Sequence, residues 1–257
     1  MPRARRPKKR RTSQAKDDRA GQLFLDAEAC RPLPSLAFLS PFLAFYAFGL
    51  IWVRPDLVAR ADLLVRRAIE PLGLTGVLAP TWLVVAVLMA WHMARRDPTR
   101  LSGRLLARMG IETLVLTVPL FALAALSLMA RSALALAIAS GRPNASPSWL
   151  AVAMTSIGAG IYEELLFRLL MVGGTLWLAR KMLRRQSEGV VVAVVLVAAA
   201  VFAGAHTLDD PARFTWASFL FRTAAGTYLG YVFAHRGFGI AAGVHMVYDL
   251  AAKLAVV

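Results

Sequence analysis

The chain has 257 residues, 58% of them apolar, and several of its apolar runs are long enough to form transmembrane helices, which need roughly 18 residues or more. This composition excludes an ordinary soluble domain and predicts an all-α, polytopic membrane helical bundle. The formal net charge of +15 is concentrated at the N-terminus, MPRARRPKKRR, and in a few short loops, as is typical of cytoplasmic segments. We expect the basic tail to set topology or to bind anionic lipid, and we expect no nucleic-acid partner.

Three regions are expected along the chain. Residues 1–35 form a basic cytoplasmic tail, expected to be disordered because its first part has almost no apolar content. Residues 36–148 contain N-terminal transmembrane helices with an interfacial segment, and residues 149–257 form a second transmembrane region. The single cysteine, Cys30, excludes an intramolecular disulfide and a cysteine-based metal cluster.

About seven transmembrane spans are predicted, and the second is the shortest. In chain order they are 36–53, 80–94, 111–130, 149–179, 189–206, 214–234 and 239–256. Between the first two, Leu57, Ala61, Leu64 and Ala68 share one helical face, with arginines on the other. That pattern fits either a helix lying on the membrane surface or a solvated loop.

Basic residues separate the loops into two groups. The second, fourth and sixth loops are basic, whereas the loop at GRPNASPS has one arginine and the loop at TLDDPAR is net acidic. The positive-inside rule therefore predicts a cytoplasmic N-terminus and, with seven crossings, an external C-terminus.

Charged residues lie inside several of the predicted spans. The run GAGIYEELLFRLLMVGG contains Glu163, Glu164 and Arg168, and the last span contains Asp249. Each would cost about 2.5–3.5 kcal/mol in lipid, so they are expected to face the protein interior or a wet cavity. Glu164 and Arg168 are four residues apart and can form an ion pair, whereas Glu163 points about 100° away. The simpler interpretation is an ion pair and a spare carboxylate that hold helices together.

Two histidines favour a chemical role instead. Phe202 and His206 are four apart in FAGAH, and His245 and Asp249 are four apart in HMVYD. Polar groups on three helices can converge on one cavity, where a carboxylate takes a proton from water and an imidazole orients that water. Hydrogen-bond donors on the opposite side of the cavity would stabilise the oxyanion that forms when water adds to a carbonyl. This set predicts peptide hydrolysis without a nucleophilic side chain. Arg222, in the sixth span, is expected to snorkel or to pair structurally rather than to balance a cavity carboxylate.

These motifs resemble those of a known family. EELLFR matches E-E-x-x-x-R, FAGAH matches F-x-x-x-H and HMVYD matches H-x-x-x-N/D, in the order found in the CAAX-processing and bacteriocin-processing (CPBP) intramembrane proteases, also called the ABI family. The resemblance covers 149–257, which would be the catalytic transmembrane core. It implies a glutamate-type endopeptidase without a cofactor or metal, acting on a membrane protein or an exported peptide. Glu163 would be the general base, and His206 would hold the attacking water.

The other motif positions would have supporting roles. The resemblance implies that Glu164 and Arg168 form a supporting pair and that His245 and Asp249 contribute to the oxyanion side or to the hydrogen-bond network. Family members that process prenylated substrates have asparagine at the position of Asp249, and an ionised aspartate cannot donate a hydrogen bond. Asp249 is therefore either protonated or a residue that orients His245.

Three other functions fit some of these residues. A metalloprotease could use Glu163, His206 and His245 as zinc ligands, although the chain has no H-E-x-x-H motif. A transporter would explain the intramembrane charges, but no inverted repeat is evident. A non-catalytic membrane protein of the same fold, an immunity or partner-binding factor, is the main alternative.

The composition suggests a bacterial protein of the inner membrane. His206 is expected near the external end of its span, which favours the anchors of exported proteins as substrates.

Overall fold

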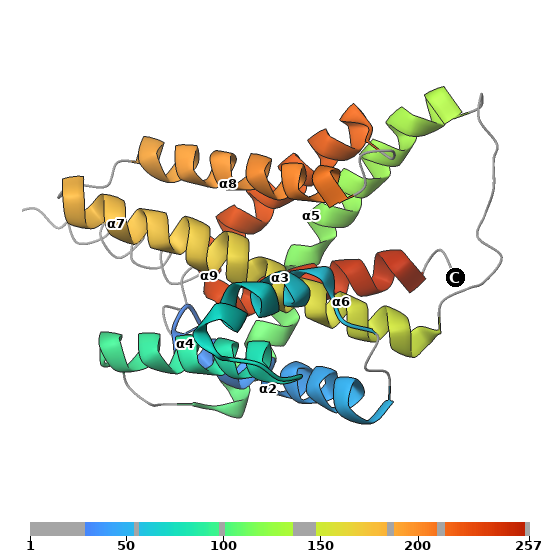
Figure 1. The fold of residues 1–257 in the computed structure, drawn as a ribbon. Coiled ribbons are helices and arrows are strands. Elements are labelled where there is room, and N and C mark those ends of the chain that lie inside the picture. The colour runs from blue at the N-terminus through green and yellow to red at the C-terminus, as the bar shows by residue number, and fades with distance from the viewer. Residues whose placement is uncertain are drawn as a thin grey trace, which may run out of the picture.

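The computed structural model describes residues 29–53, 57–97, 101–135, 148–183, 188–209 and 214–254. Most of the basic tail lies outside these ranges, so its disorder stays a prediction. The described chain contains helices and no strand, which confirms the all-α prediction (Figure 1). The helical elements are α2 (Pro32–Phe48), η1 (Gly49–Val53), α3 (Arg60–Ile69), η2 (Glu70–Leu72), α4 (Ala79–Arg95), α5 (Gly103–Ala135), α6 (Trp149–Glu163), η3 (Glu164–Gly173), α7 (Gly174–Leu183), α8 (Glu188–Asp209) and α9 (Trp216–Leu254).

Four stretches of the described chain are long and apolar enough to cross a membrane. They are Pro32–Val53, Gly103–Ser127, Trp149–Ala179 and Glu188–Thr207, and they correspond to the first, third, fourth and fifth predicted spans. The remaining predicted spans fall on α4 and on α9. The chain therefore forms a helical membrane bundle, and the total of seven crossings stays a prediction.

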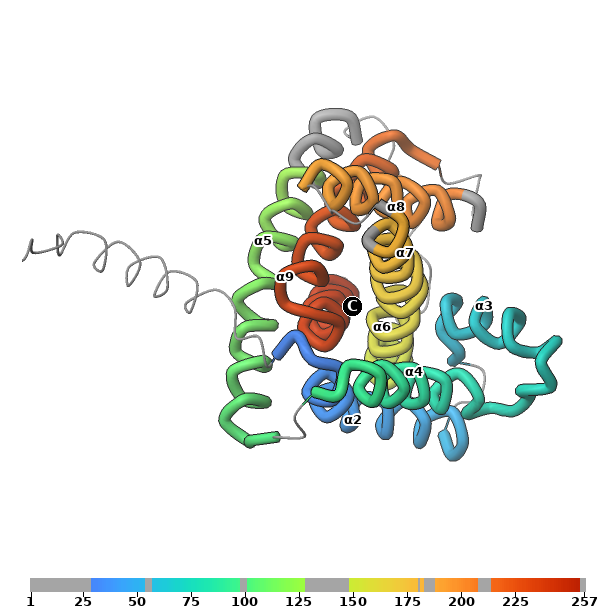
Figure 2. The backbone as a smooth tube through the Cα atoms, turned by 90° about the vertical axis from the view of Figure 1, so that its left-hand side faces the viewer, coloured from blue at the N-terminus to red at the C-terminus, as the bar shows by residue number. Residues whose placement is uncertain are grey.

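The sixth and seventh predicted spans are the two halves of α9, separated by one non-helical residue. Gly237 has φ 81° and ψ 178°, a backbone conformation that is essentially restricted to glycine. A Cβ atom there would also lie 2.8 Å from Cα of Cys30. The chain changes direction at this break. Figure 2 looks along the second half of α9, which lies between α5 and α6.

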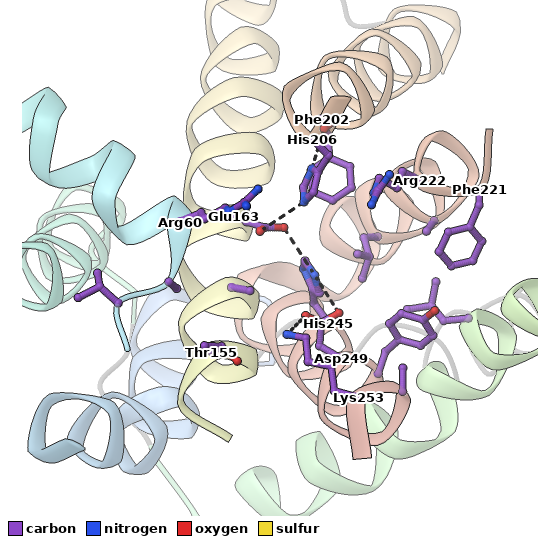
Figure 3. A pocket seen from close by; sticks show the side chains of 18 residues that line it. Arg60, Thr155, Glu163, Phe202, His206, Phe221, Arg222, His245, Asp249 and Lys253 are labelled. Carbon is purple, nitrogen blue, oxygen red and sulfur yellow. Dashed lines mark hydrogen bonds and ion pairs between the residues drawn. The ribbon is translucent and has the colours of Figure 1, made fainter. Parts of the chain in front are cut away.

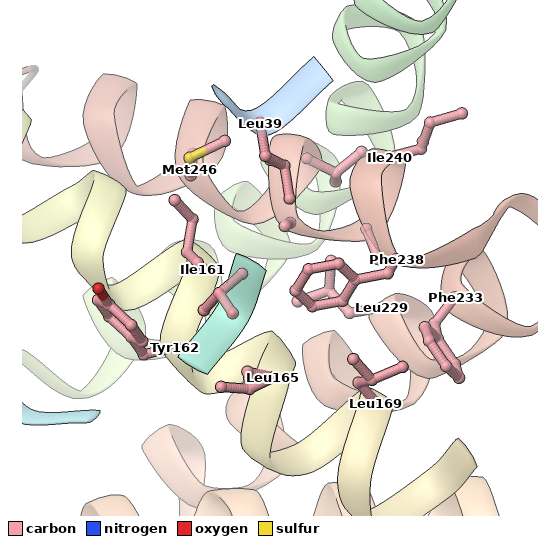
Figure 4. Close-up of a cluster of buried hydrophobic side chains, with 14 of the residues drawn as sticks. Leu39, Ile161, Tyr162, Leu165, Leu169, Leu229, Phe233, Phe238, Ile240 and Met246 are labelled. Carbon is pink, nitrogen blue, oxygen red and sulfur yellow. The ribbon is translucent and has the colours of Figure 1, made fainter. Parts of the chain in front are cut away.

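The core forms where α6 and η3 pack against α9. Buried side chains from these elements meet around Ile161, Leu165, Leu229 and Phe238 (Figure 4). Gly160 allows the closest approach, because a Cβ atom there would lie 2.8 Å from the backbone nitrogen of Met246. Close contact through small residues is how helices associate in lipid, where burial of apolar surface provides no driving force between them.

The segment between the first two spans is the helix α3, so the loop alternative is wrong. Its buried side chains are Ala61, Asp62, Val65 and Ile69, whereas Leu64 and Ala68 are exposed. Of the expected apolar face, Ala61 therefore packs against the protein and Leu64 and Ala68 point away from it, and the face that packs against the protein also includes a carboxylate. Asp62 is fully buried and accepts a hydrogen bond from the Tyr46 hydroxyl at 2.9 Å, and it forms an ion pair with Arg66 at 2.7 Å. A buried charge with such partners can hold a helix in place.

Candidate active site

Three helices bring Glu163, His206 and His245 together. Glu163 is the last residue of α6, His206 lies near the end of α8, and His245 lies in the second half of α9. One carboxylate oxygen of Glu163 is 3.6 Å from Nε2 of His206, and the other is 3.7 Å from Nε2 of His245 (Figure 3). Glu163 thus lies between the two imidazoles, as expected if the polar groups converge on one site.

Glu163 is also placed at a change of helix type. The predicted span 149–179 is continuous, but after Glu163 the α-helix becomes a π-helix over Glu164–Gly173. π-Helical segments are rare and frequently occur at functional sites. This change was not expected from the sequence, because the apolar pattern of the span gives no signal for it.

The orientation of His206 is fixed by its own helix. Its Nδ1 atom is 3.0 Å from the carbonyl oxygen of Phe202, one turn earlier. A carbonyl can only accept, so Nδ1 carries the proton and donates, and Nε2 faces Glu163 as an acceptor in the neutral ring. The Phe202 ring also packs against the imidazole, with centroids 4.7 Å apart. The F-x-x-x-H spacing therefore positions the imidazole.

Glu164 belongs to a buried network behind the site. Its side chain is fully buried, and its Oε1 atom is 3.0 Å from Nη1 of Arg168 and 2.8 Å from Nδ1 of His245. The ion pair expected from the spacing of Glu164 and Arg168 is therefore present. Its contact with His245 was missed, because no sequence spacing connects residues on different helices.

Arg168 links this network to two further elements. Its Nη2 atom donates to the carbonyl oxygen of Gly226 at 3.3 Å, and its guanidinium lies 4.6 Å from the centroid of the Phe202 ring. The buried guanidinium thus has an anion, a carbonyl and an aromatic face as partners. Such a group orients its neighbours and is not exposed to a substrate.

Asp249 has a cationic partner that sequence reasoning missed. Its Oδ2 atom is 2.8 Å from Nζ of Lys253, whereas its Oδ1 atom is 3.8 Å from Nε2 of His245. Lys253 also donates to the Ser156 hydroxyl at 3.3 Å. The available signal was the i, i+4 spacing of Asp249 and Lys253, the same signal that identified Glu164 and Arg168.

A cavity of ≈ 650 Å³ opens onto Glu163, His206, His245 and Asp249. Arg222 and Lys253 also line it, and apolar side chains such as Leu120, Phe221 and Leu229 form much of the remainder. Glu163 retains 12% exposure, whereas the adjacent Glu164 has none. The two carboxylates therefore differ in access: Glu163 can meet a water molecule and a substrate, but Glu164 cannot.

The geometry can support water activation at Glu163. A water oxygen can lie within hydrogen-bond distance of both the Glu163 carboxylate and Nε2 of His206. Within the described ranges, no group of three or more His, Cys, Asp or Glu side chains is arranged as a metal site.

Residues 145–251 match the family model of the type II CAAX prenyl endopeptidase Rce1-like proteins. The matched segment contains all three motifs, so the resemblance expected from the motifs is confirmed. Neither the curated proteins nor the solved structures contain a match to the chain. The family match and the four apolar helices indicate a membrane protein that hydrolyses peptides.

Proposed function

We propose that this chain, whose residues 145–251 match the Rce1-like endopeptidases, is a glutamate-type intramembrane protease that cuts a membrane-associated protein or an exported peptide. The observation that carries the proposal is the position of Glu163. Its carboxylate lies between two imidazoles, at 3.6 and 3.7 Å, on the wall of a cavity of ≈ 650 Å³. A spare carboxylate with only a structural role would not need access to a cavity.

The first step is the activation of water. Water donates one hydrogen to Nε2 of His206 and the other to the Glu163 carboxylate, which takes that proton as general base. The water oxygen then forms a bond to the carbonyl carbon of the peptide, and the carbonyl oxygen becomes an oxyanion. When the carbon–nitrogen bond breaks, Glu163 returns the proton to the leaving amine.

The oxyanion needs donors on the other side of the peptide. His245 donates through Nδ1 to Glu164, so its Nε2 atom faces the cavity. As an imidazolium, His245 donates from Nε2 to the oxyanion, and the buried Glu164 balances its charge. Asp249 accepts from Lys253 and supports this arrangement without donating itself.

Replacement of Glu163 by glutamine tests the proposal. The amide has nearly the same shape but cannot take a proton, so cleavage should fall by about 10²–10⁴-fold. The matched control is Glu188→Gln, which changes an exposed carboxylate in the first turn of α8. Membrane and secreted proteins are isolated from cells that carry the original chain or one of the variants. The measurement identifies proteins whose N-terminal or C-terminal peptides change in Glu163→Gln but not in Glu188→Gln.

Each result has a distinct meaning. Loss of the same cleavage in Glu163→Gln and His206→Ala, with normal protein amounts, supports a glutamate-activated water. Unchanged termini in both variants would contradict the proposal and favour an immunity or partner-binding factor. Cleavage that a chelator abolishes and zinc restores would make Glu163 and the histidines metal ligands instead.

A further inference from the structure

Arg222 is a cation in the active-site cavity that the proposed mechanism does not use. It lies in the first half of α9, six residues after the helix begins, and its side chain lines the cavity together with Glu163 and His206. Figure 3 shows Arg222 on the α9 side of the cavity, beyond His206 as seen from Glu163. It was expected to snorkel or to pair structurally, and in the structure its side chain both lines the cavity and contacts Ser218 of its own helix.

The guanidinium is held in place but is not neutralised. Arg222 donates to the hydroxyl of Ser218, one turn earlier on the same helix. No carboxylate in the described part of the chain forms an ion pair with it, whereas the cavity-lining Lys253 is paired with Asp249 at 2.8 Å. A guanidinium has five N–H donors, so most of those on Arg222 remain available.

An arginine that lines this cavity, within the predicted sixth span, implies an anionic partner. Charged side chains within spans are costly and commonly mark the path or the site of a ligand. Guanidinium groups bind carboxylates through two parallel hydrogen bonds, which fix the geometry as well as the charge. Glu163 is already between two imidazoles, so a substrate can provide the missing carboxylate.

We propose that Arg222 binds a carboxylate of the substrate and thereby selects peptides that carry one within a few residues of the bond that is cut. This inference rests on the proposed hydrolytic function and adds a substrate class to it. The carboxylate comes either from the C-terminus of the peptide or from an aspartate or glutamate side chain. In both cases Arg222 places the peptide so that its scissile carbonyl meets Glu163 and His206.

Paired peptides test this selection. A pool of apolar peptides with mixed sequences is synthesised as C-terminal acids, as C-terminal amides, and as amides with one glutamate among the last three residues. The purified full-length chain in lipid vesicles should cut the carboxylate-bearing peptides roughly 10- to 100-fold faster, in kcat/KM, than the plain amides. The two kinds of carboxylate-bearing peptide identify the source of the group.

Variants of Arg222 test whether this residue causes the preference for carboxylate-bearing peptides. In Arg222→Gln the ratio of kcat/KM for acid over amide should fall toward one, and in Arg222→Lys it should fall part of the way, because lysine keeps the charge but not the paired donors. Arg104→Gln, which removes an exposed arginine outside the cavity, should keep the full ratio. A ratio that is unchanged in Arg222→Gln, or close to one in the original chain, would overturn the inference.

A binding measurement separates this inference from the hydrolytic proposal. The peptide acids should bind the Glu163→Gln chain, and the additional Arg222→Gln change should weaken their binding by about tenfold or more, with little change for the amides. Arg222-dependent binding without cleavage by the original chain would retain the carboxylate site and refute hydrolysis. Glu163-dependent cleavage with no effect of Arg222 on binding or on the ratio would refute the carboxylate site alone.

Discussion

Glu163 and Glu164 are adjacent in sequence, but their side chains have different surroundings. The Glu163 carboxylate faces the cavity, whereas Glu164 is fully buried between Arg168 and His245. Removing one partner of a buried ion pair leaves the other charge without compensation, which costs about 3–5 kcal/mol. We therefore expect Glu164→Gln to lower the free energy of unfolding by about 3 kcal/mol, while Glu163→Gln changes it by less than about 1 kcal/mol.

Unfolding in mixed micelles, followed by the fluorescence of the 6 tryptophans, measures this difference. Glu163→Gln is the matched control because it makes the same chemical change one residue away. Equal losses of stability in the two variants would mean that Glu163 also acts as a structural carboxylate.

Asp249 and Lys253 form a pair whose members should depend on each other. Asp249→Asn leaves the Lys253 ammonium without its ion-pair partner in the cavity that His245 also lines, and it should lower kcat/KM about tenfold, whereas Lys253→Met should matter less. In the double variant the unpaired charge is gone, so much of the lost activity should return, with a coupling energy of about 1 kcal/mol. If the effects of the two substitutions on kcat/KM are additive, the 2.8 Å contact between Asp249 and Lys253 does not contribute to activity.

For the residues of the candidate site, the sequence predicted only those contacts that join residues one helical turn apart. Intramembrane charge identified Glu163, Glu164, Arg168 and Asp249, and the i, i+4 spacing identified the Glu164–Arg168 pair. Contacts between helices, such as His245 with Glu164, depend on how the helices pack and have no local signal. Lys253 was missed because it lies near the end of its span, where a lysine commonly marks only the interface.

At the scale of elements, the separation between α6 and α9 sets the distance between Glu163 and His245. Gly160 permits the contact, because an added Cβ atom would lie 2.3 Å from Cγ and 2.8 Å from the backbone nitrogen of Met246. Gly160→Ala should therefore push the helices apart and lower kcat/KM by about 100-fold, the typical effect of a 1 Å misplacement in an active site.

Gly174→Ala is the matched control for this prediction. Gly174 is helical, and a Cβ atom there would meet no other atom within 4 Å. The substitution should leave kcat/KM within about twofold and stabilise the helix by up to about 1 kcal/mol. Similar losses of activity in the two variants would show that the effect comes from helix propensity rather than from the contact with Met246.

The elements themselves were largely predictable, because long apolar runs leave little choice of structure in lipid. In the described part of the chain each predicted range falls on a helix, apart from residues at some ends, and the boundary between the last two spans lies at Gly237. The sequence did not indicate the burial of Asp62 in α3, which depends on its contacts with Tyr46 and Arg66. The contact with Tyr46 joins two helices and has no signal in the local pattern of polarity.

For the whole molecule, three segments predicted to be cytoplasmic meet at one end of the bundle. The Cys30 thiol contacts the carbonyl oxygen of His235, and the Ser35 hydroxyl accepts a hydrogen bond from the backbone of Gly239. Arg236 forms an ion pair with Glu112. The N-terminal flank of α2, the early part of α5 and the break in α9 are therefore neighbours, as the positive-inside rule requires if all three face the cytoplasm.

Two serines at helix N-termini allow the topology to be measured. Ser102 precedes α5 and Ser148 precedes α6; both are exposed, and each hydroxyl accepts a hydrogen bond from the backbone nitrogen three residues later, at 3.2 Å. Cysteine is nearly isosteric with serine, so Ser102→Cys and Ser148→Cys, each made in a Cys30→Ser chain, disturb equivalent positions equally. A membrane-impermeant maleimide should label the cysteine at 148 in intact cells and the cysteine at 102 only after the membrane is opened. The opposite pattern would invert the predicted topology, and labelling of both in intact cells would show that α5 does not cross the membrane.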